Sequence, residues 1–341
     1  MISLSQRVLV TGGQGFIGKA LAFGAFSKGF NVRVSSRNTL SGSLNNFEFS
    51  KVSSLGSSTD WLVALKDVYS VVHCAGRAHV MKDNVKDPLA AFRTVNLDAT
   101  LNLAHQAVNS GVKRFVFISS IGVNGSQTGI GNLYSEVDDP KPHNDYALSK
   151  LEAELGLMQI AAETGLEVVI IRPPLVYGPN APGNFGSLMR AVQRGWPLPL
   201  GAVHNQRSLV ALDNLVDFII TCITHPQAAN QTFLVSDGQD LSTTELVRGM
   251  AQAAGVPSRL LPVPVWALQA GASLLGKGEA VQRLCGNLQV DISKARRLLG
   301  WVPPFSVDEG LRRAMRTGDV VPGDGLPRFA RNDGADGRED S

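Results

Sequence analysis

The sequence predicts an α/β fold, in which a doubly wound parallel sheet is joined by a smaller C-terminal lobe. Short runs of β-branched and apolar residues alternate with helical stretches through the first half of the chain, as in RVLVT at 7–11, VYSVVHCA at 68–75 and EVVIIRP at 167–173. Near-continuous apolar strands are typical of a parallel sheet that helices cover on both faces.

The expected strands and helices follow one another in order. A glycine at the end of the first helix supports this interpretation, because glycine commonly follows a helix C-terminus. We expect strands at 7–11, 30–36, 47–52, 68–75, 114–119 and 167–173, and helices at 16–28, 88–111 and 146–164.

The regular alternation stops near residue 177. We therefore expect a Rossmann-type domain over 1–176 and a smaller α/β substrate lobe over 177–316, not strictly separable from it. The residues from 317 to 341 are rich in Gly, Asp and Arg without periodicity, which predicts a disordered tail. Within the lobe we expect a strand at 232–236 and helices at 243–254, 265–275 and 307–315.

Composition excludes several classes of function. With 32 basic and 29 acidic residues among 341, and no dense Lys/Arg run, we expect no nucleic-acid partner. The three cysteines, Cys74, Cys222 and Cys285, are widely spaced and form no Cys/His cluster, which predicts reduced thiols and no metal site. The N-terminal sequence has no signal-peptide pattern, so we expect a cytoplasmic location.

A long, mostly apolar run without charges is Leu260–Gly276, which contains Pro262 and Pro264. A membrane-spanning helix needs about 20 apolar residues. We therefore expect a buried or packing helix here and no membrane insertion, with a membrane contact as the less favoured alternative.

A glycine-rich turn follows the first strand. The sequence TGGQGFIG places glycines at 12, 15 and 18, ahead of the first helix. Gly12 permits a tight turn, Gly15 lets the backbone approach a pyrophosphate, and Gly18 lets the helix pack on the strand. In this strand–turn–helix context the pattern predicts a dinucleotide-binding site. The alternative is a turn that is only structural.

The end of the second strand indicates which dinucleotide is bound. NAD-binding proteins usually place an Asp or Glu there to hold the ribose 2′-hydroxyl. This chain has Ser35, Ser36 and Arg37 instead. Because hydroxyl groups and a guanidinium bind a 2′-phosphate that a carboxylate would repel, the sequence favours NADP(H), with NAD(H) as a possible cofactor. The alternative is an exposed Arg37 that only stacks near adenine.

A Tyr-x-x-x-Lys motif begins the helix at 146–164. Tyr146 and Lys150 lie four residues apart and therefore share one helix face. An ammonium group beside the phenol would lower its pKa from about 10, which makes the tyrosine a usable acid/base. Ser119 and Ser120 end the fifth strand, at the edge of a parallel sheet where ligands bind. The set predicts proton transfer to or from a substrate oxygen.

Together these motifs resemble the extended short-chain dehydrogenase/reductases. The resemblance covers about 7–313 and is strongest to the UDP-hexose 4-epimerase-like branch of the NAD(P)-dependent epimerase/dehydratase family, a branch that includes UDP-4-keto-6-deoxy-N-acetylhexosamine 4-reductases. The motifs that carry it are TGGxGFIG, HCAG at 73–76, VNLDAT with Asn96, SSxxVxG at 119–125, YxxxK and RPPLVYGP at 172–179.

The resemblance implies a role for each matching residue. Ser120 matches the catalytic Ser/Thr, Tyr146 the catalytic acid/base, and Lys150 the lysine that binds the nicotinamide ribose. It also implies a homodimer, in which the helices at 88–111 and 146–164 form a four-helix bundle. The implied cofactor contacts are Gly12, Gly15, Phe16, Ile17, Gly18, Ser36, Arg37, Ser54, Leu55, Ala75, Gly76, Asn96, Lys150 and Pro173.

The implied substrate is a UDP-sugar, with the sugar held by Ser120 and Tyr146. Arg207 matches an arginine that grips the diphosphate, and Arg283 matches a second one. His79 and Met81 are equally consistent with a place in the sugar pocket and with a structural role, whereas His73 is expected to be structural. The uracil contacts implied are Asn184, Phe185 and the segment 197–200, which contains Leu198.

Two departures from the family pattern bear on the reaction. Leu175 stands where many epimerases have a substrate-contacting Asn, and Ser54 stands where the family has an Asp beside the adenine. Both departures count against a plain UDP-glucose/galactose epimerase. Leu175, together with Ser36 and Arg37, favours an NADP(H)-dependent UDP-4-keto-6-deoxy-N-acetylhexosamine 4-reductase of surface-polysaccharide (O-antigen) synthesis. The first alternative is a UDP-hexose 4-epimerase that retains NAD, and the second is a non-catalytic NADP-sensing regulator.

Overall fold

A seven-stranded parallel sheet forms the centre of the molecule, and it confirms the predicted fold class. The computed structural model describes residues 6–38, 44, 47–78, 86–274 and 278–316. The strand order is β3-β2-β1-β4-β5-β6-β9, and every neighbouring pair is parallel. The strands are β1 (Arg7–Thr11), β2 (Asn31–Ser36), β3 (Glu48–Lys51), β4 (Val68–His73), β5 (Arg114–Ile118), β6 (Glu167–Arg172) and β9 (Gln231–Leu234).

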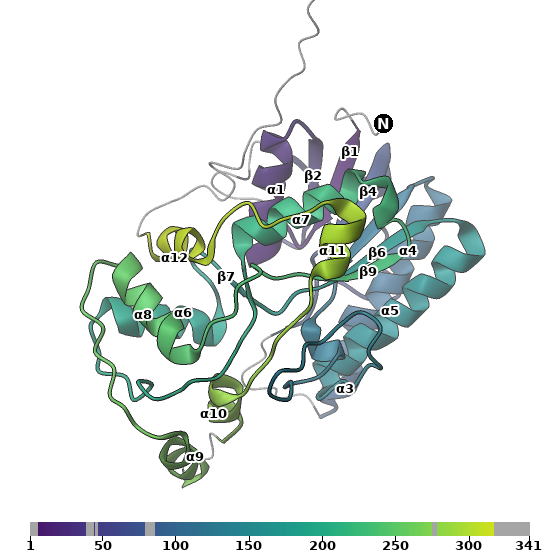
Figure 1. Cartoon of the computed structure of the whole chain (residues 1–341). Coiled ribbons are helices and arrows are strands. Elements are labelled where there is room, and N and C mark those ends of the chain that lie inside the picture. The colour runs from purple at the N-terminus through teal and green to yellow at the C-terminus, as the bar shows by residue number, and fades with distance from the viewer. Residues whose placement is uncertain (1–5, 39–43, 45–46, 79–85, 275–277, 317–341) are drawn as a thin grey trace, which may run out of the picture.

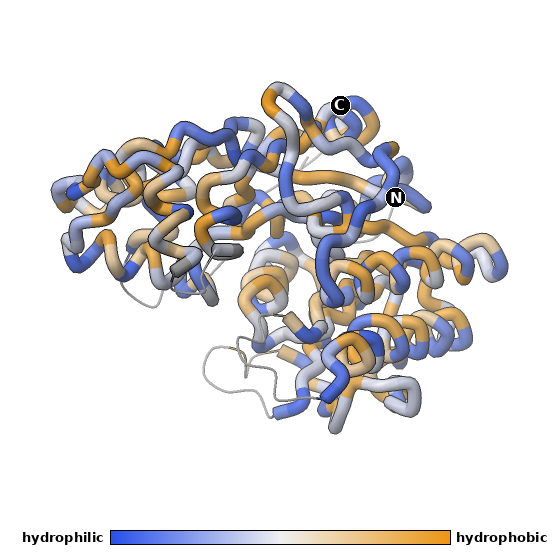
Figure 2. Tube along the Cα trace, turned by 90° about the horizontal axis from the view of Figure 1, so that it is seen from below, coloured by the Kyte–Doolittle hydropathy of each residue, from blue (hydrophilic) through white to orange (hydrophobic). Residues whose placement is uncertain are grey.

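Helices cover both faces of this sheet (Figure 1). Along β1, Val8 and Val10 face a core shared with α1 (Phe16–Ser27) and α7 (Leu212–Thr224). Leu9 between them faces the opposite core, shared with α4 (Ala99–Asn109) and α5 (Asp145–Thr164). Burial on both faces explains why the strand sequences are apolar at nearly every position. In Figure 2 the helices change between orange and blue along their turns, as helices with one apolar side do.

The helix expected at 88–111 is interrupted by a wider turn. It consists of α3 (Pro88–Arg93), a π-helical turn η2 (Thr94–Asp98) and α4. Such π-turns are uncommon and occur often at functional sites. This one carries Asn96, whose side chain is fully buried.

The C-terminal half builds the smaller lobe and also returns to the main sheet. The strand expected at 232–236 is present as β9, but it pairs with β6 in the main sheet, whereas the sequence predicts a place in the lobe. The lobe has its own core and a short parallel pair, β7 (Leu175–Tyr177) with β8 (Leu209–Ala211). Its other elements are α6 (Gly183–Gln193), α8 (Thr243–Ala253), α9 (Val265–Leu274), α10 (Gly278–Cys285) and α12 (Val307–Met315), while α11 (Ser293–Leu299) packs on β9.

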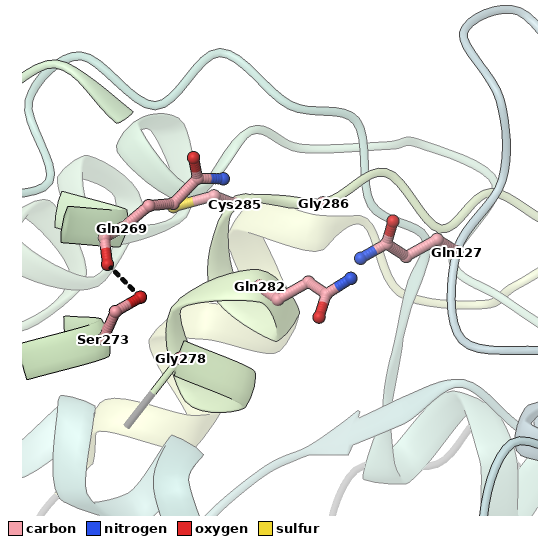
Figure 3. A pocket seen from close by; sticks show the side chains of 7 residues that line it. All are labelled: Gln127, Gln269, Ser273, Gly278, Gln282, Cys285 and Gly286. Atoms are coloured by element: carbon pink, nitrogen blue, oxygen red, sulfur yellow. Dashed lines mark hydrogen bonds between the residues drawn. The ribbon is translucent and has the colours of Figure 1, made fainter. Parts of the chain in front are cut away.

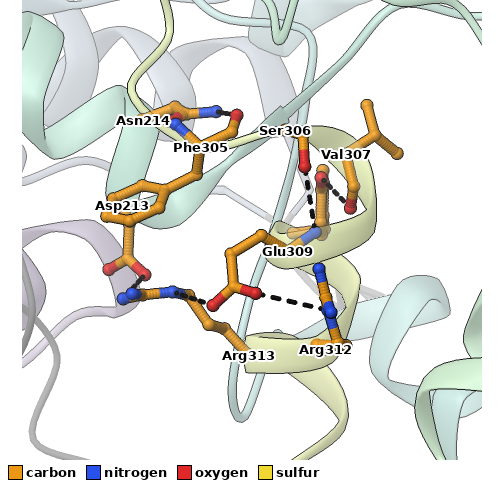
Figure 4. Close-up of polar contacts among 9 residues, drawn as sticks. Asp213, Asn214, Phe305, Ser306, Val307, Glu309, Arg312 and Arg313 are labelled. Atoms are coloured by element: carbon orange, nitrogen blue, oxygen red, sulfur yellow. Dashed lines mark hydrogen bonds and ion pairs between the residues drawn. The ribbon is translucent and has the colours of Figure 1, made fainter.

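A cluster of polar contacts fixes α12 to the start of α7 (Figure 4). The Nη1 of Arg313 lies 3.1 Å from the Oδ2 of Asp213, and its guanidinium lies 4.0 Å from the ring centroid of Phe305. Asn214 donates to the carbonyl oxygen of Phe305 at 2.8 Å and accepts from the same residue's N–H at 3.0 Å. The lobe is therefore held against a helix that itself packs on the sheet.

A buried ion pair joins α5 to β6. The Nη2 of Arg172 lies 2.6 Å from the Oε2 of Glu154, and both side chains are less than one-tenth exposed. The same carboxylate accepts from the Ser119 hydroxyl, and Arg172 donates to the Oδ1 of Asn124 at 2.9 Å. These four residues lie at or just beyond the carboxyl ends of β5 and β6, or on the helix that packs there, so they brace the edge of the sheet that carries Ser120.

Removing one partner of this pair should destabilise the chain strongly, because it leaves an unpaired charge in the interior. We predict that Glu154→Ala lowers the free energy of unfolding by about 3–5 kcal/mol. The matched control is Glu152→Ala on the same helix, whose partner Arg93 is 42% exposed and whose loss should cost about 1 kcal/mol or less. Urea unfolding of the three proteins measures both values, and equal losses would contradict this account of the pair.

Candidate active site

The glycine turn after β1 leaves no room for side chains at two positions. Gly12 has φ +67°, and a Cβ on it would lie 2.8 Å from the backbone N and Cα of Ala75. A Cβ on Gly18 would overlap the carbonyl oxygen of Gly12. Gly15 is the N-cap of α1, and no side chain caps that helix. The N–H groups of the first turn are therefore available to an anion.

A cavity of about 320 Å³ opens beside this turn. It contains seven of the predicted cofactor residues, and no carboxylate lines it at the end of β2. The sequence does not single out Trp61, Val52 or Gln14, because nothing in their spacing marks them as ligand contacts. The lining residues are Gly12, Gln14, Gly15, Ser35, Ser36, Arg37, Asn38, Val52, Leu55, Trp61, Cys74, Ala75 and Gly76.

The remaining predicted cofactor residues do not line this cavity. Phe16 and Ile17 are half-buried and pack against the core, and Gly18 is buried behind the turn. Ser54 is exposed, and its carbonyl oxygen accepts from the hydroxyl of Thr59 at 2.9 Å. Pro173 is buried, and its carbonyl oxygen accepts from the N–H of Ile121 at 3.0 Å.

Asn96 holds the segment that follows β4. Its Oδ1 accepts from the N–H of Arg77 at 2.8 Å, and its Nδ2 donates to the Arg77 carbonyl and to the Ser149 hydroxyl, each at 3.1 Å. These contacts use the side-chain amide on the protein itself. Asn96 therefore positions the backbone at the cavity edge, and a direct contact with a cofactor stays a prediction.

His73 lies in a buried chain of hydroxyl contacts. Its Nδ1 is 2.7 Å from the Thr11 hydroxyl and its Nε2 is 3.0 Å from the Thr100 hydroxyl. Since Thr11 accepts from the N–H of Ala75 and Thr100 donates to the Asn96 carbonyl, the pattern is satisfied when His73 accepts at Nδ1 and donates at Nε2. Burial, followed by the charge of Lys150, lowers the pKa of His73 to about 3. The ring is neutral and structural, as the sequence predicts.

Ser120 and Tyr146 meet at the carboxyl edge of the sheet. Ser120 follows β5 and caps the short helix Ile121–Val123 by accepting from the N–H of Gly122 at 3.1 Å. Tyr146 lies in the first turn of α5, which is capped by Asn144. The Ser120 side chain is near enough to the Tyr146 phenol to lower the pKa of that phenol. The fold thus brings together two of the three predicted catalytic residues.

Lys150, the third predicted catalytic residue, lies near the edge of the glycine-loop cavity. It is 4% exposed, and its Nζ donates to the carbonyl oxygen of Ile118 at 2.9 Å. The ammonium also lies 4.4 Å from the ring centroid of Phe117. A Cβ placed on Gly76 would lie 3.5 Å from Nζ, so Lys150 reaches the edge of the glycine-loop cavity. Catalytic and cofactor regions therefore adjoin one another.

The pKa values differ from the prediction in one respect. The sequence predicts that Lys150 lowers the pKa of Tyr146, but in the structure burial raises that pKa to about 12, and the Ser120 side chain opposes the rise. Lys150 is directed at Ile118 instead. Burial lowers its own pKa to about 8, against the charges of Cys74 and Glu154. In this structure the phenol is a proton donor at neutral pH.

The predicted substrate residues fall into different environments. Arg207 is half-buried, and its Nη1 donates to the carbonyl oxygen of Gly286 at 3.0 Å. Arg283 is exposed on the neighbouring α10. Asn184 is exposed in the first turn of α6, whereas Leu198 is half-buried. His79 lies outside the described residues.

The side chain of Phe185 is buried, and its predicted uracil contact stays a prediction. The resemblance implies a place in a uracil site, but the side chain is only 5% exposed and its ring centroid lies 5.6 Å from that of Tyr177. Phe185 therefore belongs to the lobe core. Leu175, at the position of the family's Asn, is 40% exposed.

A second cavity, of about 460 Å³, lies between α9, α10 and the segment around Gln127 (Figure 3). Its wall includes Gly286, whose carbonyl Arg207 holds. The amides of Gln127 and Gln282 point toward one another across it. These amides can hydrogen-bond a polar ligand, and nothing in the sequence marks them, because glutamine is common on surfaces. The lining residues are Gln127, Gln269, Ser273, Gly278, Gln282, Cys285 and Gly286.

Among the described residues, no group of three or more His, Cys, Asp or Glu side chains could hold a metal ion. No helix in the described part of the chain has the length and hydropathy to cross a bilayer.

The fold and site together define an enzyme class. A glycine loop opening a parallel sheet, beside a Ser, Tyr and Lys set at the sheet's carboxyl edge, is the arrangement of nicotinamide-dependent oxidoreductases of the extended short-chain dehydrogenase/reductase type. The chain belongs to the NAD-dependent epimerase/dehydratase family, whose family model matches residues 8–236.

Relatives and solved structures agree with this placement. The chain is 48% identical over 312 residues to a UDP-glucose 4-epimerase of Vibrio cholerae, which covers 91% of this chain and 94% of the relative. The structure of a UDP-glucose 4-epimerase of Thermus thermophilus in complex with NAD matches with TM-score 0.72 and 25% identity, over 91% of this chain and 97% of the other. A UDP-N-acetylglucosamine 4-epimerase of Bacillus cereus matches in fold, with TM-score 0.74, 21% identity, and coverage of 92% and 100%.

Two glycine variants should distinguish an effect on folding stability from an effect on dinucleotide binding. Gly12→Ala forces a side chain into the left-handed region and against Ala75, so we predict a loss of about 1–2 kcal/mol or more in unfolding free energy. Gly15 has φ −73°, which alanine adopts easily, and a Cβ placed on it would meet only the Gly12 carbonyl oxygen, at 3.1 Å. Gly15→Ala should retain the melting temperature but weaken dinucleotide binding, because its methyl group lies where a pyrophosphate would approach. Unchanged affinity by calorimetry would contradict the anion site.

The buried Lys150 should cost stability. Below about pH 8 Lys150 is charged in the folded and the unfolded chain, so the burial of its charge lowers the free energy of unfolding in full. Between about pH 8 and 10.5 the lysine is neutral in the folded chain but still protonated in the unfolded chain. The free energy of unfolding therefore rises with pH over this range, until the cost of the buried charge is gone. Lys150→Met should therefore raise the unfolding free energy at neutral pH by about 1–3 kcal/mol, with no gain above pH 10.5, while activity is lost.

The control for this variant is Lys113→Met, an exposed position at which we expect no such gain. Denaturant unfolding at several pH values measures the difference between the two. A stability gain that does not depend on pH would show that Lys150 is not charged in the interior.

Proposed function

We propose that this chain is a UDP-sugar 4-epimerase, which inverts the hydroxyl group at C4 of a hexose linked to UDP. The observation that carries the proposal is the 48% identity to a UDP-glucose 4-epimerase, which runs through the sheet and through the substrate lobe alike. The Ser120, Tyr146 and Lys150 arrangement supports it, because inversion at C4 needs an acid/base at O4 beside a nicotinamide.

The sequence favours the first of two reactions, reduction of a 4-keto sugar, over epimerisation. The comparisons support the alternative better, since the similar proteins described above are epimerases. The 4-ketoreductase keeps one observation in its favour. The cavity wall at the end of β2 has Ser35, Ser36 and Arg37 without a carboxylate, which suits a 2′-phosphate and hence NADP(H).

The residues present fit a nicotinamide dinucleotide. In the glycine turn, a side chain at Gly12 would strain the backbone, and one at Gly15 would obstruct the approach of a pyrophosphate. The N-terminus of α1, which no side chain caps, begins at this turn. When bound, the nicotinamide would accept and return a hydride at C4. For the epimerase we propose NAD(H), held by the glycine loop, by Ser36 at the adenosine ribose and by Lys150 at the nicotinamide ribose.

Proton transfer is assigned to the chain's own residues. Tyr146, as the phenolate, accepts the proton of O4 while the hydride leaves C4, and the phenol so formed returns the proton to O4 when the hydride comes back. The Ser120 side chain lowers the pKa of the phenol and so favours the phenolate that the first step requires. The Ser120 hydroxyl also positions O4, and the neighbouring loop is fixed by the Gly122 contact.

The substrate is assigned to the cavity whose wall includes Gly286. A UDP-sugar carries two negative phosphates, and the half-buried Arg207 is a cation bonded to the carbonyl oxygen of Gly286, a residue of the cavity wall that several amide side chains share. Arg283, on the adjacent α10, is proposed as the second cation. The predicted homodimer through the helices at 88–111 and 146–164, the cytoplasmic location and the place in polysaccharide synthesis stay predictions.

The test is conversion of UDP-galactose to UDP-glucose by the purified chain without added dinucleotide. We expect turnover, and we expect about one equivalent of NAD to be released when the protein is denatured. Tyr146→Phe should lower the rate by about 10²–10⁴-fold. The control is Tyr69→Phe, at the amino end of β4, which should be as active as the wild type.

The reductase would give a different result. It would show no conversion of UDP-galactose and would oxidise NADPH only with a 4-keto sugar. That outcome, or a Tyr146→Phe protein with most of its activity, would overturn the proposed function.

A further inference from the structure

Two exposed tryptophans lie on neighbouring segments at the tip of the smaller lobe. Trp196 is 55% exposed and Trp266 is 71% exposed, whereas the other two tryptophans, Trp61 and Trp301, are buried at 1% and 5%. Leu261, which lies between them in the sequence, is 51% exposed. The two segments that carry these side chains, 190–199 and 257–266, are called the lobe rim below.

The segments of the lobe rim are neighbours although they are far apart in the sequence. The N–H of Leu198 donates to the carbonyl oxygen of Arg259, and the N–H of Leu261 donates to the carbonyl oxygen of Leu198, each at 2.8 Å. The second segment continues into α9, where Val265 and Leu268 pack against the lobe core. Trp266 is therefore directed outward. In Figure 1, α9 lies at the end of the lobe far from the main sheet.

The charged residues of the lobe rim are all basic. Arg190, Arg194 and Arg259 are exposed, and the guanidinium of Arg194 lies 5.6 Å from the ring centroid of Trp196. Although the chain has 29 acidic residues, the sequence contains no Asp or Glu from 168 to 212 or from 246 to 278. The apolar side chains are thus accompanied by cations without neighbouring acidic residues in their own segments.

This combination matches one kind of partner. Tryptophan is enriched at the interface between lipid and water, where the ring is partly buried and the N–H stays hydrated. Each arginine near an anionic bilayer contributes favourably, by about fivefold in affinity. We propose that the lobe rim docks on the surface of an anionic lipid bilayer, with Trp196, Leu261 and Trp266 at headgroup depth and the arginines on lipid phosphates.

A second copy of the chain fits this surface less well. A two-fold interface would place each copy's rim against the same patch of its partner. It would then oppose cations with cations, and neither segment offers a carboxylate to pair with them. Nucleic acid fits less well too, because Leu261 and the exposed prolines 197, 199, 257, 262 and 264 offer no contact to phosphates.

The test uses the full chain and vesicles of phosphatidylcholine, with or without phosphatidylglycerol. We expect co-sedimentation with the phosphatidylglycerol vesicles alone, weakened by salt. Tryptophan emission should shift to the blue and be quenched by lipids brominated near the headgroup. Because Trp61 and Trp301 are already buried, the change reports the lobe rim.

Variants with matched controls locate the contact. Trp196→Ser with Trp266→Ser should abolish co-sedimentation, whereas Phe26→Ser, which removes a 60% exposed ring from α1, should not. Changing Arg190, Arg194 and Arg259 to Gln should weaken binding about hundredfold. The charge-matched control changes Lys66, Lys113 and Arg297, all exposed outside the lobe rim, to Gln. Unchanged melting temperatures show that each variant is folded.

Each other outcome overturns the proposal. Absence of binding at low salt, equal binding to neutral vesicles, or equal loss in the two charge variants would each do so. A dimer in sedimentation velocity that the tryptophan double variant abolishes would assign the surface to a second copy. An emission shift of the same size with a single-stranded oligonucleotide would assign it to nucleic acid.

Discussion

The close packing of the segment after β4 sets the geometry of the whole site. Residues 74–78 lie so near the glycine turn that only a glycine fits at position 12, and so near α5 that Gly76 lies beside the Lys150 ammonium. Asn96 and Thr11 hold this segment by hydrogen bonds from either side. Because one piece of backbone borders both the cofactor cavity and the catalytic residues, their relative position is fixed by the sheet and does not depend on surface loops.

The same packing places charges where they are costly. Lys150, Glu154 and Arg172 are all buried at the carboxyl edge of the sheet. The ion pair compensates two of them, whereas the direct contacts recorded for the Lys150 ammonium among the described residues are a carbonyl oxygen and a ring face, and burial lowers its pKa. A fold selected for stability alone would place an apolar residue there. The lysine is explained by its place at the edge of the cavity, next to the phenol that moves the proton.

The local features were predictable from the sequence, and those set by packing were not. Apolar strands, the glycine turn and the i, i+4 pair of Tyr146 and Lys150 are properties of neighbouring residues. The place of β9 beside β6 depends on the route of the whole chain, and the π-turn at Thr94–Asp98 adds one residue to a helical turn without changing the apolar pattern. Phe185 is apolar, which suits a ligand surface and a core equally, and only packing shows that it is core.

In the proposed epimerase, one site removes and returns the same hydride at C4 of a UDP-sugar. This can be followed with UDP-galactose that carries deuterium at C4. We expect UDP-glucose with the deuterium still at C4, formed without consumption of added dinucleotide. Product that forms only with added NADPH, and whose C4 hydrogen comes from that NADPH, would contradict it.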